Sequence, residues 1–190
     1  KFYMQKKINF INLGKHPITN NFLDFCSPKN EFFYNLKLIF HSETKLVSLA
    51  KFVSPKKMFN EKYAHRASAS KTMQIAYAKL AKSIKKKYKP KSILEIGSND
   101  GVFIKHFNNI NNLGVEPCKN LAQITRKMGI KTYDDFWTTK LSKKIIKKNK
   151  RFDVIYSANT ISHIHNLDEA FNAISSSLND DGIFILEDPS

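Results

Sequence analysis

The chain has 190 residues, of which 42% are hydrophobic, 12% aromatic and 25% charged, with only 6 glycines and 6 prolines. This composition is typical of a folded globular protein and excludes a disordered or collagen-like chain. No uncharged apolar run approaches the roughly 18 residues that span a bilayer, and the N-terminus lacks the apolar block of a signal peptide. We therefore expect a soluble, cytoplasmic protein with no membrane partner.

The net charge is +16, from 32 basic and 16 acidic residues, and a field of that strength favours polyanions, nucleotides or anionic surfaces. Only Arg66, Arg126 and Arg151 are arginines, although arginine is the preferred residue for bidentate phosphate and guanine contacts. The lysine clusters at 82–91 and 140–151 lie in or beside predicted helices, where a solvated helix face explains them. We therefore expect no specific nucleic-acid partner, and a polyanion-binding module remains an alternative.

Cys26 and Cys118 are the two cysteines and lie far apart in the chain. This usage fits a reducing compartment and provides neither a disulfide framework nor a metal-binding pair. The chain opens at Lys1 without an initiator Met and stops at Ser190, directly after a predicted buried strand. We therefore expect it to be a fragment of a longer protein.

From Ser92 onward, short apolar runs alternate with segments that repeat apolar residues every three or four positions. The runs predict strands over Ile93–Ile96, Leu113–Glu116, Ile130–Tyr133, Phe152–Ala158 and Gly182–Glu187. The segments between them predict helices over Val102–Phe107, Asn120–Met128, Thr139–Lys147 and Leu167–Leu178. Such alternation is typical of an α/β fold with a parallel sheet, and right-handed crossovers predict the strand order 3-2-1-4-5.

The part before this sheet divides into a helix and a less regular region. Thr72–Tyr88 is predicted to be an amphipathic helix, with Ser70 as its N-cap and Pro90 closing the segment. Residues 1–70 are predicted to be a small irregular appendage, whose β-like pieces are Leu36–Phe40 and Leu46–Ala50. The change of pattern predicts two domains, 1–70 and 71–190.

Two glycines lie in the segment Leu94–Gly101, which joins the first predicted strand of the sheet to its helix. Glycine permits a tight turn at this corner, and free amides at a helix start attract polar or anionic groups. The Gly97-x-x-x-Gly101 spacing lacks the three-glycine fingerprint of dinucleotide binders, which argues against NAD and FAD. Glu116 ends the second strand and is placed to accept hydrogen bonds from ribose hydroxyls. Together these features predict a nucleoside-binding site.

Six motifs follow one another along the chain: Leu13-Gly14-x-x-Pro17-x-x-Asn20-Asn21-Phe22-Leu23, Tyr63-x-x-Arg66-x-Ser68-x-Ser70, Leu94 to Gly101, Gly114-Val115-Glu116-Pro117-x-x-Asn120-Leu121-Ala122, Asn159-x-x-x-His163-Ile164 and Gly182-x-x-x-x-Glu187-Asp188-Pro189. Glu95-x-Gly97 followed by Glu116 resembles the S-adenosylmethionine site of class I methyltransferases. The whole series resembles their sugar C-methyltransferase branch, which has an N-terminal zinc-binding domain and a C-terminal extension. The resemblance covers the chain from about Leu13 to Ser190.

The resemblance implies a Rossmann-like fold and S-adenosylmethionine as the cofactor. The residues that it assigns to the cofactor are Glu95, Gly97, Ser98, Asn99, Gly101, Glu116, Asp135, Phe136 and Asn159. Among them, Glu95 and the two glycines would shape the pocket for the methionine part, and Glu116 would hold the ribose. Asp135 and Phe136 would flank the adenine, although a helix cap and a core residue are equally good interpretations of this pair.

The resemblance also implies a catalytic role for His163, which follows the fourth strand of the sheet. In the resembled enzymes, a His at this point is proposed to remove the proton next to a sugar ketone, which produces an enolate that attacks the methyl group of the cofactor. Tyr63 would hydrogen-bond the nucleotide-sugar or the enolate. Taken alone, a His in a loop is more often a surface or capping residue, and Tyr63 is also explained as packing between the appendage and the main domain. The family more often has a second Tyr where this chain has His65.

The zinc site of the resembled family consists of two Cys-x-x-Cys pairs, which make a closed tetrahedral structural site. This chain has His41 and Thr44 where the second pair is expected, and the first pair would fall before residue 1. Thr is a poor zinc ligand, so we expect no bound metal. Cys26 is better explained as a small buried residue.

These observations predict a truncated class I methyltransferase that transfers a methyl group to carbon of a nucleotide-linked keto-deoxysugar. We expect the fragment alone to be inactive, and the sequence leaves the acceptor and the oligomeric state open. Besides the polyanion-binding module, two alternatives remain. One is a methyltransferase acting on oxygen or nitrogen of another small molecule, and the other is a noncatalytic scaffold.

Overall fold

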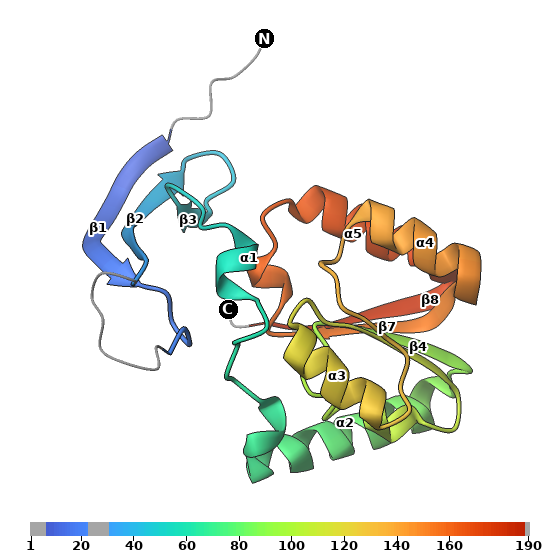
Figure 1. Ribbon diagram of the computed structural model, residues 1–190. Coiled ribbons are helices and arrows are strands. Elements are labelled where there is room, and N and C mark those ends of the chain that lie inside the picture. Colours follow the sequence, from blue (N-terminus) through green and yellow to red (C-terminus); the bar gives the residue numbers. More distant parts are fainter. Residues whose placement is uncertain (1–6, 23–30, 189–190) are drawn as a thin grey trace. The chain divides into compact units, whose positions relative to one another are not determined.

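The computed structural model describes residues 7–22 and 31–188 (Figure 1). Leu23, Cys26, Pro189 and Ser190, which the sequence analysis named, lie outside these ranges. The chain divides into two compact units, Lys1–Met58 and Phe59–Ser190, and each is described by itself. The boundary between the units, after Met58, lies earlier in the chain than the boundary near residue 70 that the change of sequence pattern predicted.

The first unit contains a three-stranded antiparallel sheet in the order β1-β2-β3. Its elements are β1 (Lys7–Pro17), β2 (Phe33–His41), β3 (Val47–Leu49) and the short helix α1 (Pro55–Met58). The two β-like pieces predicted from the sequence fall on β2 and β3. The sequence did not indicate β1, because two register shifts along its pairing with β2 interrupt the alternation that marks a strand.

The second unit is built on a five-stranded parallel sheet in the order β6-β5-β4-β7-β8. The strands are β4 (Ser92–Ile96), β5 (Asn111–Val115), β6 (Thr132–Tyr133), β7 (Phe152–Ala158) and β8 (Leu178–Glu187). This order confirms the predicted α/β fold class and the arrangement 3-2-1-4-5.

Four of the predicted helices are present: α2 (Lys71–Tyr88), α3 (Lys119–Lys127), α4 (Thr139–Asn149) and α5 (Leu167–Ser177). Ser70 caps α2 as predicted, because its side chain accepts a hydrogen bond from the backbone N–H of Met73 at 3.3 Å. Lys89 adopts a left-handed conformation that ends the helix before Pro90. Across the described residues, no helix is both long and apolar enough to pass through a bilayer.

The helix predicted over Val102–Phe107 was wrong, since the structure has only a four-residue 3₁₀ helix there, η3 (Ile104–Phe107). Val102, Phe103, Ile104 and Phe107 are all buried. Lys105 and His106 are half-buried, so the segment exposes little surface, and its apolar spacing reflects the core. The other 3₁₀ helices are η2 (Ala67–Ala69) and η4 (Ile161–His163).

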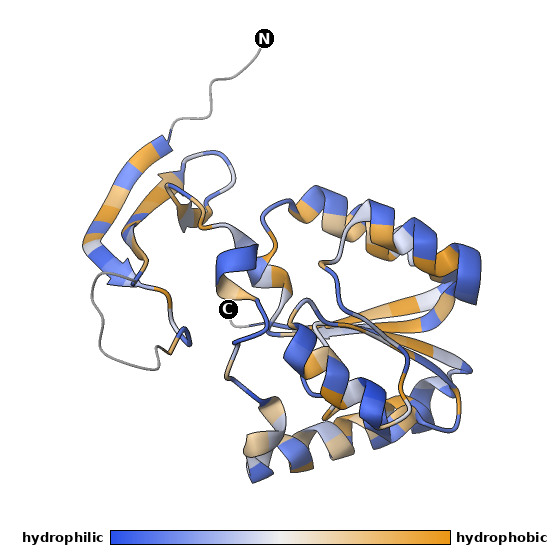
Figure 2. Cartoon of the chain, viewed as in Figure 1, coloured by the Kyte–Doolittle hydropathy of each residue, from blue (hydrophilic) through white to orange (hydrophobic). Residues whose placement is uncertain are grey.

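Helices cover both faces of the parallel sheet (Figure 1). On one face, Leu94, Ile96 and Ile155 pack in a buried cluster with residues of α4 and α5. On the other face, Ile93 and Val154 pack with α2 and with the η3 segment. In Figure 2, β4 and β7 are coloured mainly as hydrophobic, whereas α4 and α5 carry both colours, as expected for helices with one buried side.

Candidate functional site

The candidate site lies at the edge of the parallel sheet where the strands end. Gly97 follows β4, Glu116 follows β5, Asn159 follows β7, and Asp188 follows β8. Open α/β sheets bind their ligands at this carboxyl edge. The fold therefore brings residues from four separate sequence motifs to one edge.

The turn after β4 requires glycine at position 97. Gly97 has a φ of +75°, in the left-handed region that residues with side chains rarely adopt. A Cβ at this position would also overlap the side chain of Thr160. The backbone N–H groups of Gly97 and Ser98 both donate to the carbonyl oxygen of Val115, at 2.8 and 3.1 Å, so the turn is attached to the end of β5.

Glu116 is buried, with 5% of its surface exposed, and its carboxylate organises the same turn. Oε2 accepts a hydrogen bond from the backbone N–H of Asn99, and Oε1 accepts one from that of Cys118, both at 2.8 Å. Burial raises the pKa of Glu116, whereas these hydrogen bonds oppose the rise by stabilising the charged form. Burial also raises the pKa of the neighbouring Cys118 thiol, which is therefore not a reactive thiolate.

Glu95 and Ser98 carry buried oxygens that have no hydrogen-bond partner, namely Oε2 of Glu95 and Oγ of Ser98. Burial raises the pKa of Glu95 well above its usual range, and the charges of Glu116 and Asp100 raise it further, while a hydrogen bond from the Ile104 backbone lowers it. Buried polar groups in folded proteins are normally paired, so unpaired ones require an explanation. A ligand that brings hydrogen-bond donors to the Gly97 turn would pair them.

The segment before α2 is attached to this turn by two side chains, and to α3 by a third. Oδ1 of Asn99 accepts from the backbone N–H of Ala67 at 2.9 Å, and the carboxylate of Asp100 accepts from the backbone N–H and the hydroxyl of Ser68. Nδ2 of Asn120 donates to the carbonyl oxygen of Tyr63 at 2.8 Å. The side chain of Asn99, which the sequence analysis assigned to the cofactor, thus connects the turn to the segment that carries Tyr63.

Tyr63 and His163, the two predicted catalytic residues, each have their ring close to the ring of Phe59. The centroid of the Phe59 ring is 5.5 Å from that of Tyr63 and 5.5 Å from that of His163. The ring of His65 lies 6.4 Å from that of Tyr63. Phe59 could not be identified from the sequence, because no motif includes this residue. The contact between Phe59 and His163 joins residues that are far apart in the chain.

The remaining predicted site residues lie around the same edge. Asp135 and Phe136 follow β6, and Oδ1 of Asp135 accepts a hydrogen bond from the backbone N–H of Phe136 at 2.8 Å. Asn159 is exposed, has a φ of +49°, and donates its backbone N–H to the carbonyl oxygen of Glu187 at 2.7 Å. None of these contacts involves the Gly97 turn, and the roles of these three residues toward a ligand stay predictions.

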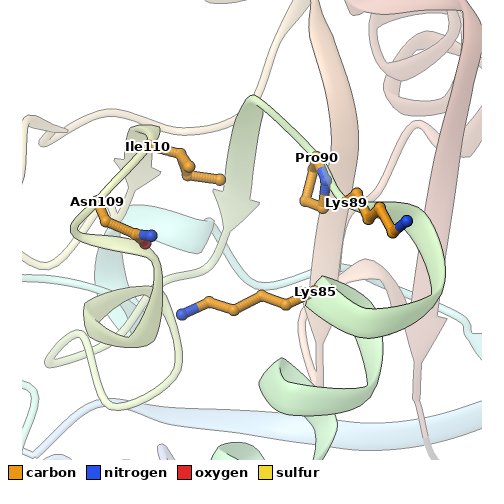
Figure 3. Close-up of a pocket in the computed structure, with 5 residues that line it drawn as sticks. All are labelled: Lys85, Lys89, Pro90, Asn109 and Ile110. Atoms are coloured by element: carbon orange, nitrogen blue, oxygen red, sulfur yellow. The ribbon is translucent and has the colours of Figure 1, made fainter.

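A pocket of about 250 Å³ lies at the other edge of the sheet, where β4 and β5 begin, and Figure 3 shows its lining: Lys85, Lys89, Pro90, Asn109 and Ile110. Both lysines lie at the C-terminal end of α2, where positive side chains stabilise the negative end of the helix dipole. These lysines thus have a structural explanation, and the pocket is separate from the candidate site.

Two family models match the chain. The model described as "Methyltransferase domain" matches residues 61–190, and the model described as "Putative zinc binding domain" matches residues 4–59. Within the described residues, no group of three or more His, Cys, Asp or Glu side chains is arranged to hold a metal ion. In the first unit, Nε2 of His41 lies 2.7 Å from Oγ of Ser48, at hydrogen-bond distance.

Among curated proteins, the chain is similar to the C-methyltransferase NovU of Streptomyces niveus. The two are 23% identical over 188 residues, which cover 96% of this chain and 44% of NovU. The chain therefore spans less than half the length of this relative.

Two solved structures share the fold. DesVI of Streptomyces venezuelae matches with a TM-score of 0.50 and 14% identity, covering 61% of this chain and 50% of DesVI. An S-adenosylmethionine-dependent methyltransferase of Archaeoglobus fulgidus matches with a TM-score of 0.52 and 16% identity, covering 62% of this chain and 53% of that protein. The resemblance predicted from the sequence motifs is thus confirmed. Because the methyltransferase model matches more than half of the residues, the chain belongs to the methyltransferase domain family.

Proposed function

We propose that the chain is the cofactor-binding part of an S-adenosylmethionine-dependent methyltransferase that methylates carbon of a small-molecule acceptor. One observation carries the proposal: Oε2 of Glu95 and Oγ of Ser98 are buried without hydrogen-bond partners at the Gly97 turn, and the charge of Glu116 acts on Glu95. Family membership supports the reaction class. The similarity to NovU, which is named a C-methyltransferase, favours carbon as the methylated atom.

The residues at the turn fit the cofactor. When bound, S-adenosylmethionine supplies an electrophilic methyl group. Oε2 of Glu95 would accept a hydrogen bond from the ammonium group of the cofactor, and Gly97 and Gly101 would shape the pocket for its methionine part. Glu116 accepts from the ribose hydroxyls, because each carboxylate oxygen has a second lone pair besides the one that faces a backbone N–H.

His163 is the general base in this proposal, and the acceptor is a nucleotide-linked keto-deoxysugar. A neutral imidazole nitrogen of His163 takes the proton from the carbon next to the ketone. The electron pair of that C–H bond stays with the acceptor as an enolate, whose carbon is the nucleophile. The hydroxyl of Tyr63 donates a hydrogen bond to the enolate oxygen, and the ring of Phe59 packs against the rings of both Tyr63 and His163.

The proposal is tested by exchange of that acceptor proton for deuterium in the full-length protein. We expect His163→Ala to slow exchange and lower kcat by roughly 10²- to 10⁴-fold, and to leave the affinity for S-adenosylhomocysteine unchanged. His165→Ala is the matched control, because His165 is exposed and lies two residues further on.

Three outcomes contradict parts of the proposal. If His163→Ala exchanges the proton and methylates at the parent rate, His163 is not the base. If methylation proceeds with no exchange at carbon in any variant, the methyl group goes to oxygen or nitrogen. If the parent protein shows no affinity for S-adenosylhomocysteine, the cofactor assignment fails.

A further inference from the structure

Asp188, which follows β8, holds the 3₁₀ turn that carries His163. Its Oδ2 accepts a hydrogen bond from the backbone N–H of Ile161 at 3.0 Å, and its Oδ1 accepts one from Oγ of Ser162 at 2.9 Å. Ile161, Ser162 and His163 together form η4. The contact thus connects the end of β8 to the turn that follows its neighbour β7.

The turn has no side-chain cap within its own segment. Thr160 precedes η4, but its side chain makes no capping hydrogen bond, and its Oγ1 donates instead to the carbonyl oxygen of Ala158 at 2.9 Å. The first N–H groups of a helical turn have no partner inside the turn. Asp188 therefore provides the acceptor that Ile161 needs and Thr160 does not supply.

A backbone contact reinforces this attachment one residue earlier. The N–H of Asn159 donates to the carbonyl oxygen of Glu187 at 2.7 Å, and Asn159 adopts a φ of +49°, which redirects the chain at the end of β7. The loop that leads to His163 is therefore held to β8 through two consecutive residues, Glu187 and Asp188.

The side chain of His163 is exposed, so its direction depends on the turn beneath it and on few packing contacts. The Phe59 ring lies against it at a centroid distance of 5.5 Å and an interplanar angle of 59°. A shift of η4 would therefore move the imidazole relative to both Phe59 and the acceptor.

We infer that Asp188 is a positioning residue for His163, an inference that rests on the proposed role of His163 as the base. Both oxygens of Asp188 accept hydrogen bonds from η4, so the carboxylate acts on the orientation of the imidazole through the turn that carries it. A general base has to lie within hydrogen-bond reach of the proton that it removes, and small displacements of a catalytic group lower the rate strongly.

Two substitutions at this position separate geometry from charge. Asp188→Asn keeps both contacts, because the amide oxygen can accept from Ile161 and the amide N–H can donate to the Ser162 hydroxyl, which can also accept. Asp188→Ala loses both. In the full-length protein we expect Asp188→Ala to lower kcat by roughly 10- to 100-fold. We expect Asp188→Asn to stay near the parent value, and both variants to keep the parent affinity for S-adenosylhomocysteine.

A double-mutant cycle and an exchange measurement identify the route of the effect. In a His163→Ala background, Asp188→Ala is expected to cause no further loss of kcat, because its effect requires the imidazole. The backbone amide of Ile161 is expected to exchange with solvent faster in Asp188→Ala than in Asp188→Asn. Ser162→Ala removes only one of the two contacts, and we expect a smaller loss of kcat, which keeps the inference testable if Asp188→Ala does not fold.

Failure of this inference can be distinguished from failure of the proposed function. If His163→Ala is slow but Asp188→Ala and Ser162→Ala turn over at the parent rate, Asp188 does not position the base. A loss from Asp188→Ala that persists at full size in the His163→Ala background also overturns the inference, as does unchanged exchange of the Ile161 amide. If instead His163→Ala is fully active, the base assignment itself is wrong.

Discussion

Oε2 of Glu116 accepts a hydrogen bond from the backbone N–H of Asn99 at 2.8 Å, which joins the end of β5 to the turn after β4. The side chain of the same Asn99 holds the segment before α2 through the N–H of Ala67. Glu116 is thus connected, through Asn99, to the segment that carries Tyr63. A change at Glu116 is therefore expected to affect the cofactor site first and the acceptor side through it.

Glu116→Ala is expected to lower the affinity for S-adenosylhomocysteine roughly tenfold or more. Hydrogen bonds to a charged acceptor typically contribute about 1.5 to 3 kcal/mol each, and the substitution removes those to the ribose. Asp180→Ala is the matched control, because it removes a carboxylate whose side chain is 99% exposed, at the start of β8. Calorimetric titration measures the affinity of each variant for S-adenosylhomocysteine. Equal affinity of Glu116→Ala and the parent would disprove the ribose assignment.

Glu95 is expected to make stability depend on pH. In the folded chain the pKa of Glu95 is raised, mainly by burial. The contribution of Glu95 to the free energy of unfolding is therefore fully present below pH 4.5, the pKa of the group in the unfolded chain, and is lost as the pH rises through the folded pKa. Glu95→Gln cannot ionise, so we expect a higher melting temperature at neutral pH and a flatter stability profile above pH 4.5.

Thermal denaturation across this pH range measures the effect, with the exposed Glu61→Gln as the control. Because Glu95→Gln also removes the partner proposed for the cofactor ammonium group, its affinity for S-adenosylhomocysteine is expected to fall. A Glu95→Gln variant that melts below the parent at every pH would contradict the prediction.

Gly97→Ala is expected to destabilise the fold more than Gly129→Ala. Both glycines have positive φ values, +75° and +79°, so both substitutions incur backbone strain of roughly 1 to 2 kcal/mol. A Cβ on Gly129 meets no atom within 4 Å, whereas one on Gly97 would overlap Thr160, which adds roughly 1 to 3 kcal/mol.

Chemical denaturation of the two variants measures the difference in their free energies of unfolding. Thr160→Gly is expected to restore part of the lost stability in the Gly97→Ala background only. Equal destabilisation at the two glycines would show that packing against Thr160 is not what requires glycine after β4.

The purified protein is expected to contain much less than one zinc per chain, and a chelator is expected to leave its melting temperature unchanged. The reason is the ligand set, since His41 and Thr44 stand where a pair of thiolates is expected, and thiolates are the main ligands of closed structural zinc sites. Elemental analysis tests this expectation. Stoichiometric zinc that is lost in His41→Ala would contradict it.

The sheet and its turns could be predicted because their signals are local. A strand-helix alternation determines a parallel sheet, and right-handed crossovers then restrict the strand order, which the structure confirms. Gly97 and Ser70 were predictable for the same reason, since a sharp turn and a helix N-cap each depend on a few consecutive residues. The η3 segment was mispredicted because apolar residues that all pack into the core can have the same spacing as those of an amphipathic helix.

The sequence by itself therefore determined the fold class, the order of the strands and the sheet edge at which the candidate site lies. Only the tertiary structure decided which residues meet there: Phe59 with His163, Asn99 with Ala67, and Asp188 with Ile161. Each of these contacts joins segments that the sheet brings together from distant parts of the chain. Their geometry depends on packing and on the direction of single side chains, and a pattern of residue types along one segment contains no information about either.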